Sequence, residues 1–225
     1  MMEPVVRVAR SLLNVSSHFH AFRELVELLT RHRHLMTEMA KREISDRYSG
    51  QFFGTFWAVG HPLTMIAVYI FIFNVVFKTR IGGTADMPLD YTVYLLSGLI
   101  PWLAFQESMS KASLAVVGNA NLVKQVIFPI EALPVKSVLA SLVTQCVFLA
   151  ALTIYVVVTQ RVLMWTYLLL PALIVVQALA MIGVSYVLSA VGVYVRDTKD
   201  FVQVFSLVGV YLMPTVLPIA ARGET

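Results

Sequence analysis

The chain has 225 residues, of which 58% are hydrophobic and 13% charged, and its formal net charge is +4. Soluble domains are nearer half apolar and a quarter charged, so a chain of this composition would expose large apolar patches in water. The composition therefore predicts an integral membrane protein rather than a soluble enzyme, and the single cysteine, Cys146, excludes an intrachain disulfide.

The N-terminal segment, residues 1–50, is polar and basic and is predicted to be cytoplasmic. It has no apolar core ahead of a small-residue cleavage site, so no cleavable signal peptide is predicted. Residues 19–48 lack Gly and Pro, and their apolar residues recur at three-to-four spacing among charged ones. Because a long apolar stretch follows directly, this pattern favours a helix lying in the membrane surface over an ordinary solvated helix.

Residues 51–225 are predicted to form a transmembrane domain of all-α class. Five apolar stretches predict five transmembrane helices, at 52–77, 91–110, 134–158, 164–194 and 201–220. The first stretch would be about 39 Å long at a helical rise of ~1.5 Å per residue, whereas the apolar core of a bilayer is ~30 Å thick. A tilt, or a kink at Pro62, is expected to absorb the excess length.

Polar and helix-breaking residues separate or interrupt these stretches. Glu107 and Lys111 close the second stretch as an i,i+4 pair with the acid first, which is the favoured order. Residues 112–131 are predicted to form short helices and turns at the membrane surface. The residues expected to interrupt, bend or end the later spans are Pro171, Gly183, Pro214 and Pro218.

The basic residues predict the orientation. With the N-terminus inside, 13 of the 17 Lys and Arg residues lie on the cytoplasmic side and four lie outside. Cytoplasmic loops carry such an excess of basic residues, so the N-terminus is predicted to be cytoplasmic. The charged run 196–200 then lies inside as well, and residue 225 lies outside.

The sequence offers little catalytic chemistry. No Gly is followed by Lys, so there is no Walker A phosphate loop, and His32 and His34 lie two apart on the predicted helix and point to different faces. Apart from His61, the predicted spans carry almost no ionisable side chain, which argues against an ion-coupled carrier or a membrane enzyme. We predict no catalytic residue, metal, cofactor or nucleic-acid partner, and an external motor would have to supply the energy for transport.

Residues 42–62, REISDRYSGQFFGTFWAVGHP, resemble the start of the polysaccharide-exporting ABC transporter permeases. The matching positions are Arg42, Glu43, Ile44, Arg47, Tyr48, Gly54, Trp57 and Pro62. Phe53 replaces the usual Leu. Three further blocks agree in order: YLLSGLIPWLAFQES at 94–108, NANLVKQVIFPIEALP at 119–134 and YVRDTKD at 194–200.

This resemblance implies an all-α permease of the cell inner membrane, with an amphipathic interface helix before the first span. It implies a homodimer that forms a channel at the subunit contact, and a separate ABC ATPase subunit, so that the chain itself is not an enzyme. The substrate would be a lipid-linked polysaccharide such as O-antigen, capsule or a teichoic-acid-like polymer. The family has six spans, so the sixth is expected to be missing from this sequence.

The resemblance also implies which residues contact the ATPase, namely the interface helix and the loop between the second and third spans. The positions implied are Arg42, Glu43, Arg47, Tyr48, Asn119, Asn121, Lys124, Phe128, Pro129 and Glu131. The distribution of basic residues independently predicts that both segments are cytoplasmic.

Aromatic residues gather at the outer end of the first predicted span. Tyr69, Phe73 and Phe77 recur at i, i+4 and i+8 and so share one helical face, and Tyr91 and Tyr94 open the second span at the same depth. These rings are a candidate substrate path, because sugar C–H faces stack on aromatic rings. An aromatic belt at the lipid interface is the alternative interpretation.

Two other functions remain open at this stage. The chain could be an ABC permease for a drug or a lipid, or a membrane scaffold or truncated fragment that transports nothing. The aromatic face and the family blocks favour the polymer exporter.

Overall fold

The computed structural model describes residues 23, 27, 30–72, 91–124, 129–161 and 165–212. The elements in chain order, with η marking a 3-10 helix, are α3 (Arg33–Tyr48), η1 (Gly54–Phe56), α4 (Trp57–Phe71), α5 (Tyr91–Ala112), η4 (Val117–Asn119), α6 (Ala120–Val123), α7 (Ala132–Gln160), η5 (Trp165–Leu169), α8 (Leu170–Tyr194) and α9 (Thr198–Leu212). All of these elements are helical, so the predicted all-α class is confirmed for the described part of the chain.

The third and fourth predicted spans are present as long apolar helices. The helical segments Ala132–Thr159 and Trp165–Tyr194 have 28 and 30 residues and are long and apolar enough to cross a membrane. Many of their large side chains are exposed, with Ile154 64% and Val158 71% exposed. Such an apolar surface suits contact with lipid better than contact with water.

The fourth span is not interrupted where the sequence suggested. η5 leads directly into α8, and Pro171 is the second residue of that helix. The first N–H groups of a helix have no partner within it, so a proline is tolerated there. Gly183 lies inside the continuous helix, so the prediction of breaks at these two positions is wrong. Pro214 and Pro218 lie outside the described residues.

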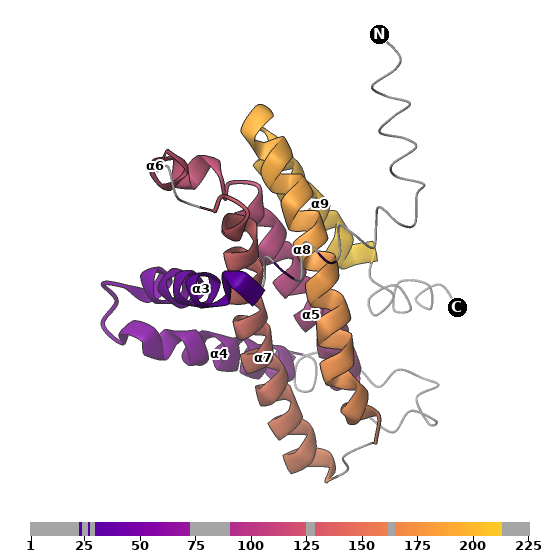
Figure 1. The fold of residues 1–225 in the computed structure, drawn as a ribbon. Coiled ribbons are helices and arrows are strands. Elements are labelled where there is room, and N and C mark those ends of the chain that lie inside the picture. Colours follow the sequence, from indigo (N-terminus) through magenta and orange to yellow (C-terminus); the bar gives the residue numbers. More distant parts are fainter. Residues whose placement is uncertain are drawn as a thin grey trace.

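α3 and α4 form a hairpin, which corrects the predicted start of the first span. The span was expected from Phe52, but a turn and η1 precede α4, which begins at Trp57. Gly50 and Gly54 have φ angles of 79° and 49°, which glycine adopts without the steric cost that other residues incur. In Figure 1 the two helices lie side by side and run across the direction of α7.

α4 alone does not establish a membrane crossing. Its 15 residues would measure about 22 Å at ~1.5 Å per residue, less than the ~30 Å of the apolar core. A full span over 52–77 would need residues beyond Ile72, which lie outside the described residues, so this span stays a prediction.

α7 is the central helix of the bundle and packs against α3, α4, α5 and α8. In Figure 1 α7 and α8 run in opposite directions, and α6 lies at the end opposite the connection between them. Arg161, which follows α7, and η5, which precedes α8, belong to that connection. The junction of α8 and α9, which carries the charged run 196–200, lies at the same end as α6. Two of the segments predicted to be cytoplasmic, the one that contains α6 and the run 196–200, therefore lie at the same end of the bundle.

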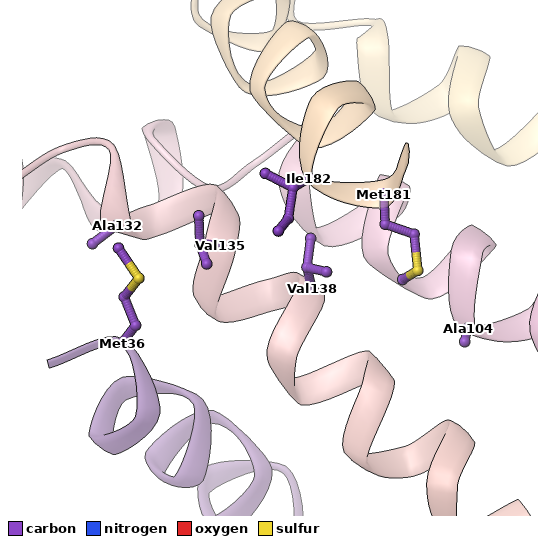
Figure 2. Packing of buried hydrophobic residues seen from close by; sticks show 7 residues of the cluster. All are labelled: Met36, Ala104, Ala132, Val135, Val138, Met181 and Ile182. Carbon is purple, nitrogen blue, oxygen red and sulfur yellow. The ribbon is translucent and has the colours of Figure 1, made fainter. Parts of the chain in front are cut away.

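Two apolar clusters hold the helices. The first, shown in Figure 2, joins α3, α5, α7 and α8 through Met36, Ala104, Ala132, Val135, Val138, Met181 and Ile182. The second joins α4, α5 and α7 through Ile66, Val93, Leu96, Leu99, Ile100, Leu152 and Val156. Because lipid tails are as apolar as these side chains, close packing rather than exclusion of water stabilises such contacts in a bilayer.

Glycines allow two of the closest helix contacts. A Cβ atom at Gly192 in α8 would lie 2.1 Å from the carbonyl oxygen of Ser113, just after α5. A Cβ atom at Gly209 in α9 would lie 2.0 Å from the ring of Trp102 in α5. Small residues at helix interfaces permit this close approach in membrane proteins.

Candidate functional site

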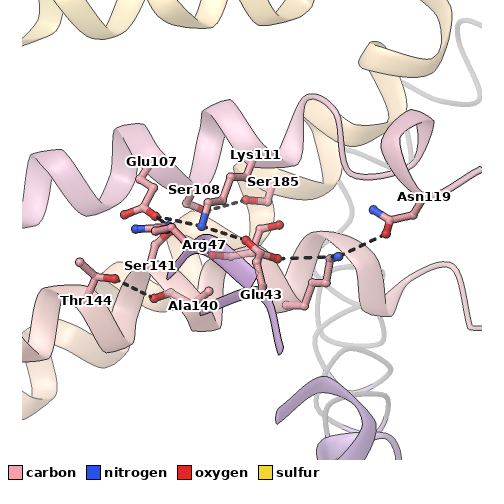
Figure 3. A network of polar contacts seen from close by, with 12 residues as sticks. Glu43, Arg47, Glu107, Ser108, Lys111, Asn119, Ala140, Ser141, Thr144 and Ser185 are labelled. Atoms are coloured by element: carbon pink, nitrogen blue, oxygen red, sulfur yellow. Dashed lines mark hydrogen bonds and ion pairs between the residues drawn. The ribbon is translucent and has the colours of Figure 1, made fainter. Parts of the chain in front are cut away.

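Five charged side chains meet where α3 crosses α5 and α7, and we call them the ionic cluster. Its members are Glu43 and Arg47 of α3, Glu107 and Lys111 of α5, and Lys136 of α7. On α3 and on α5 the two charged residues stand four apart, so both side chains project from one face of their helix. Figure 3 shows the two faces turned toward each other.

Ion pairs connect all three helices within the ionic cluster. Lys111 Nζ lies 2.8 Å from Glu43 Oε1 and 2.9 Å from Glu107 Oε1, so this one ammonium group bridges α3 and α5. Arg47 also pairs with Glu107. Lys136 Nζ lies 3.7 Å from Glu43 Oε2, which adds α7. The predicted Glu107–Lys111 pair is confirmed.

The ionic cluster is partly buried and carries an excess of positive charge. Its side chains are between 15% and 32% exposed, and three cations face two carboxylates. Burial by itself would lower the pKa of Arg47, but the adjacent Glu107 carboxylate and the Tyr48 side chain together outweigh it and raise that pKa above its ordinary value. Arg47 is therefore held as a cation.

Asn119 links the ionic cluster to the segment between α5 and α7. Lys136 Nζ donates to Asn119 Oδ1 over 3.4 Å, and Asn119 Nδ2 donates to the carbonyl oxygen of Ala115 over 2.8 Å. Lys136 thereby contacts both α3 and the start of the surface segment 117–124. A displacement of that segment would therefore act on Lys136, and through it on the other side chains of the ionic cluster.

The predicted ATPase-contact residues divide into two groups. Glu43, Arg47 and Asn119 come together around Lys136 and Glu107. Arg42 points away and pairs with Asp46 over 3.7 Å at 83% exposure. Exposed or half-buried positions outside the ionic cluster are Asn121, Lys124, Pro129 and Glu131. Tyr48 is buried at 8% exposure, and Phe128 lies outside the described residues.

Sequence reasoning did not place Glu107, Lys111 and Lys136 in the candidate site. From the sequence, Glu107 and Lys111 are predicted only to pair with each other at the end of the second span, and nothing there points to Lys136. The available signal was the spacing of Glu43 and Arg47, which repeats that of Glu107 and Lys111. Two helices with complementary i,i+4 pairs can dock through them, but the sequence does not say that they cross.

A hollow of about 680 Å³ opens beside the ionic cluster, between α4, α5 and α7. Arg47, Glu107 and Lys111 line it on one side, and Tyr69, from the predicted substrate path, lines it from α4. Tyr94 lines a different cavity, between α5, α7 and α8. Phe73 and Phe77 lie outside the described residues, as does the side chain of Tyr91, so the shared path stays a prediction.

Comparison with known proteins gives one family match whose range includes every residue of the ionic cluster. Residues 34–221 match the family described as ABC-2 type transporter. Two proteins from Klebsiella pneumoniae, each called O-antigen export system permease protein RfbA, are 26% and 27% identical over 194 residues, which is 84% of this chain and 70% of each relative. A protein of the same name from Myxococcus xanthus is 26% identical over 199 residues, 87% of this chain and 73% of the relative.

Proposed function

This chain belongs to the ABC-2 type transporter family, and on that premise we propose that it is the permease subunit of an ABC exporter that moves a lipid-linked polysaccharide out of the cytoplasm. The three relatives named above are O-antigen export permeases, and each aligns with more than four fifths of this chain. We further propose that it lies in the inner membrane with its N-terminus cytoplasmic, works as a homodimer and is driven by a separate ATPase subunit.

The ionic cluster is the observation that carries this proposal. It fastens α3 and the Asn119 segment, which lie at the predicted cytoplasmic side, to α5 and α7 inside the bundle. A protein that converted ATP hydrolysis elsewhere into motion of membrane helices would need such a link. Charge pairs of 2.8 and 2.9 Å resist separation because the partly buried partners would be left uncompensated.

The ATPase is proposed to contact the exposed surface next to the ionic cluster. Arg42 on α3 and Asn121 and Lys124 after η4 are exposed and lie outside the buried pairs. These residues can bind a partner without breaking the ionic cluster, and the ionic cluster would pass the partner's movement to α5 and α7. Recognition at the surface and transmission below it would thus involve different residues.

The substrate path is proposed to include the hollow beside the ionic cluster. Tyr69 supplies an aromatic surface there, and Tyr48, Gln51 and Gln106 supply polar groups. Stacking contacts are weak and tolerant of sliding, which suits a polymer that must not be held tightly. Phe73, Phe77 and Tyr91 are proposed to continue this path, whereas Tyr94 lines the other cavity and is not included.

The proposal is tested by retention of the ATPase and by export. The tagged chain is expressed with the ABC ATPase proposed as its partner, and bound ATPase and surface polysaccharide are both measured. Arg42→Glu combined with Lys124→Glu is expected to lower ATPase retention at least fivefold, because it reverses two exposed charges without touching the ionic cluster. Arg161→Glu, a reversal of an exposed charge at the opposite end of α7, is the matched control and should retain the ATPase.

The second measurement separates a transporter from a scaffold. Deletion of the gene is expected to abolish surface polysaccharide and leave its lipid-linked precursor inside the cell. If the chain bound the ATPase but its deletion left surface polysaccharide unchanged, polysaccharide export would be the wrong function.

A further inference from the structure

A cavity of about 590 Å³ lies between α5, α7, α8 and η5, and it shares no lining residue with the ionic cluster. Its walls are largely apolar, with Leu149, Leu152 and Ile174 among them. Two glutamine side chains, Gln145 of α7 and Gln177 of α8, interrupt this apolar lining. Polar side chains inside the helix bundle of a membrane protein are energetically costly, so they usually serve a function.

The hydrogen bonds of these amides fix which way each one points. The carbonyl oxygen of Pro101 can only accept, so the group facing it at 3.0 Å is the amide nitrogen of Gln177. The oxygen Oε1 of Gln177 therefore faces Gln145, which donates to it from Nε2 over 2.8 Å. The last polar atom in this series of hydrogen bonds is the amide oxygen of Gln145, Oε1, which can only accept a hydrogen bond.

Gln145 Oε1 has no donor among the described residues. The side chain is 2% exposed, and the oxygen makes no hydrogen bond in this part of the chain. A buried acceptor without a donor is unfavourable, and inside a bilayer bulk water does not supply one. The orphan oxygen lies on a residue that lines the cavity, so a molecule in the cavity could supply the missing donor.

Other polar groups of the cavity wall also present acceptors. Ser97 donates its hydroxyl proton to the carbonyl oxygen of Tyr94 over 2.7 Å, and Thr153 donates to that of Leu149 over 2.8 Å. Each hydroxyl has thus committed its proton to its own helix and keeps only lone pairs for a ligand. Together with Gln145 Oε1, they can accept hydrogen bonds from a ligand, while Tyr94, Thr166 and Tyr167 of the same lining carry hydroxyl groups that can donate as well as accept. A ligand hydroxyl group, which donates and accepts, fits both kinds of group.

We propose that this cavity binds an uncharged acyl lipid with a free hydroxyl group, such as a monoacylglycerol or a diacylglycerol. The hydroxyl donates to Gln145 Oε1, and the acyl chain lies along Leu149, Leu152 and Ile174. The volume is within the ~300–1,000 Å³ typical of small-molecule sites, enough for the head and the first part of a chain. The lining holds no Asp, Glu, Lys, Arg or His to compensate a charged headgroup. This site does not depend on the proposed export function.

Photolabelling in nanodiscs tests the proposal. The full chain is reconstituted in phosphatidylcholine, which has no free hydroxyl, and is labelled with a monoacylglycerol that carries a diazirine in its acyl chain. The methyl ester of the same diazirine fatty acid, which cannot donate a hydrogen bond, is the matched probe. The monoacylglycerol is expected to label α7 and α8 peptides saturably and at least fivefold more than the ester, and Gln145→Leu should lower its labelling to the ester's value.

Two further variants complete the design. Ile154→Leu, at an exposed position of α7 outside the cavity lining, should label like the wild type. If Gln145→Leu does not give a monodisperse protein, Ile174→Trp takes its place; it narrows the cavity without altering the amides and should lower labelling by a similar factor. Equal labelling by the two probes on the wild type would mean that Gln145 is satisfied by water or that lipid contacts are unselective, and would overturn the proposal.

Discussion

Burial distinguishes two Lys–Glu pairs of nearly the same length in this chain. Lys111 and Glu43 lie 2.8 Å apart with side chains 26% and 18% exposed, and they join two helices. Lys41 and Glu38 lie 2.7 Å apart within α3, with side chains 72% and 52% exposed. Water screens the second pair far more effectively, so equal distances do not imply equal contributions to stability.

We therefore predict different coupling energies for the two pairs. A double-mutant cycle with Glu43→Gln and Lys111→Met should give about 1–2 kcal/mol, whereas a cycle with Glu38→Gln and Lys41→Met should give a clearly smaller coupling, because water screens that pair. The measurement is the free energy of unfolding of the detergent-solubilised chain. Equal couplings would show that the ionic cluster is as solvated as an ordinary surface.

At the scale of single residues, only contacts within one helix could be predicted from the sequence. The pair of Glu107 with Lys111 follows from i,i+4 spacing. The pair of Glu43 with Lys111 requires α3 to cross α5, and no local pattern contains that information. Arg42 and Arg47 look alike in the sequence, yet one is 83% exposed and the other joins the ionic cluster.

At the scale of helices, length and apolar character were predictable but breaks were not. α7 extends the predicted span 134–158 by two residues at each end. Gly50 and Gly54 turn the chain before α4, whereas Gly183 lies inside a continuous helix. The difference lies in backbone conformation, since a glycine permits a positive φ without requiring it.

Two glycines of α8 should respond in opposite ways to a methyl group. Gly192→Ala would place its Cβ 2.1 Å from a backbone oxygen, whereas a Cβ at Gly183 meets no atom within 4 Å. We expect Gly192→Ala to lower the free energy of unfolding by about 1–3 kcal/mol through overpacking. Gly183→Ala should raise it by roughly 0.5–1 kcal/mol, because alanine is the better helix former.

Both variants are compared by equilibrium unfolding in one detergent. The pair controls for helix propensity, since both changes are the same substitution in the same helix. A neutral Gly192→Ala would mean that α8 does not approach Ser113 as closely as described.

At the scale of the molecule, the helix arrangement puts two predicted cytoplasmic segments, the one that contains α6 and the run 196–200, at one end of the bundle. Lys136 ties Asn119 to the start of α7, and Arg161 follows the end of α7. The 29 residues of α7 would measure about 43 Å at ~1.5 Å per residue, more than the ~30 Å of the apolar core. Lys124 and Arg161 should therefore lie on opposite sides of the membrane.

Cysteine accessibility tests this sidedness. In a Cys146→Ser background, a membrane-impermeant maleimide applied to intact spheroplasts is expected to label Arg161→Cys. It should label Lys124→Cys only after the membrane is opened, with at least a tenfold difference between the two conditions. Labelling of Lys124→Cys in sealed spheroplasts would reverse the orientation and remove the surface proposed for the ATPase.

The close contact between Gly192 and the carbonyl group of Ser113 also limits how the helices can move. Its neighbours in α8 are Val191 and Val193, so a rotation of α8 by one residue about its own axis would bring a branched side chain against that oxygen. α5 and α8 should then travel as one rigid piece during a transport cycle. Any gate that opens and closes must work by displacement of other helices relative to this piece, not by α8 turning in place.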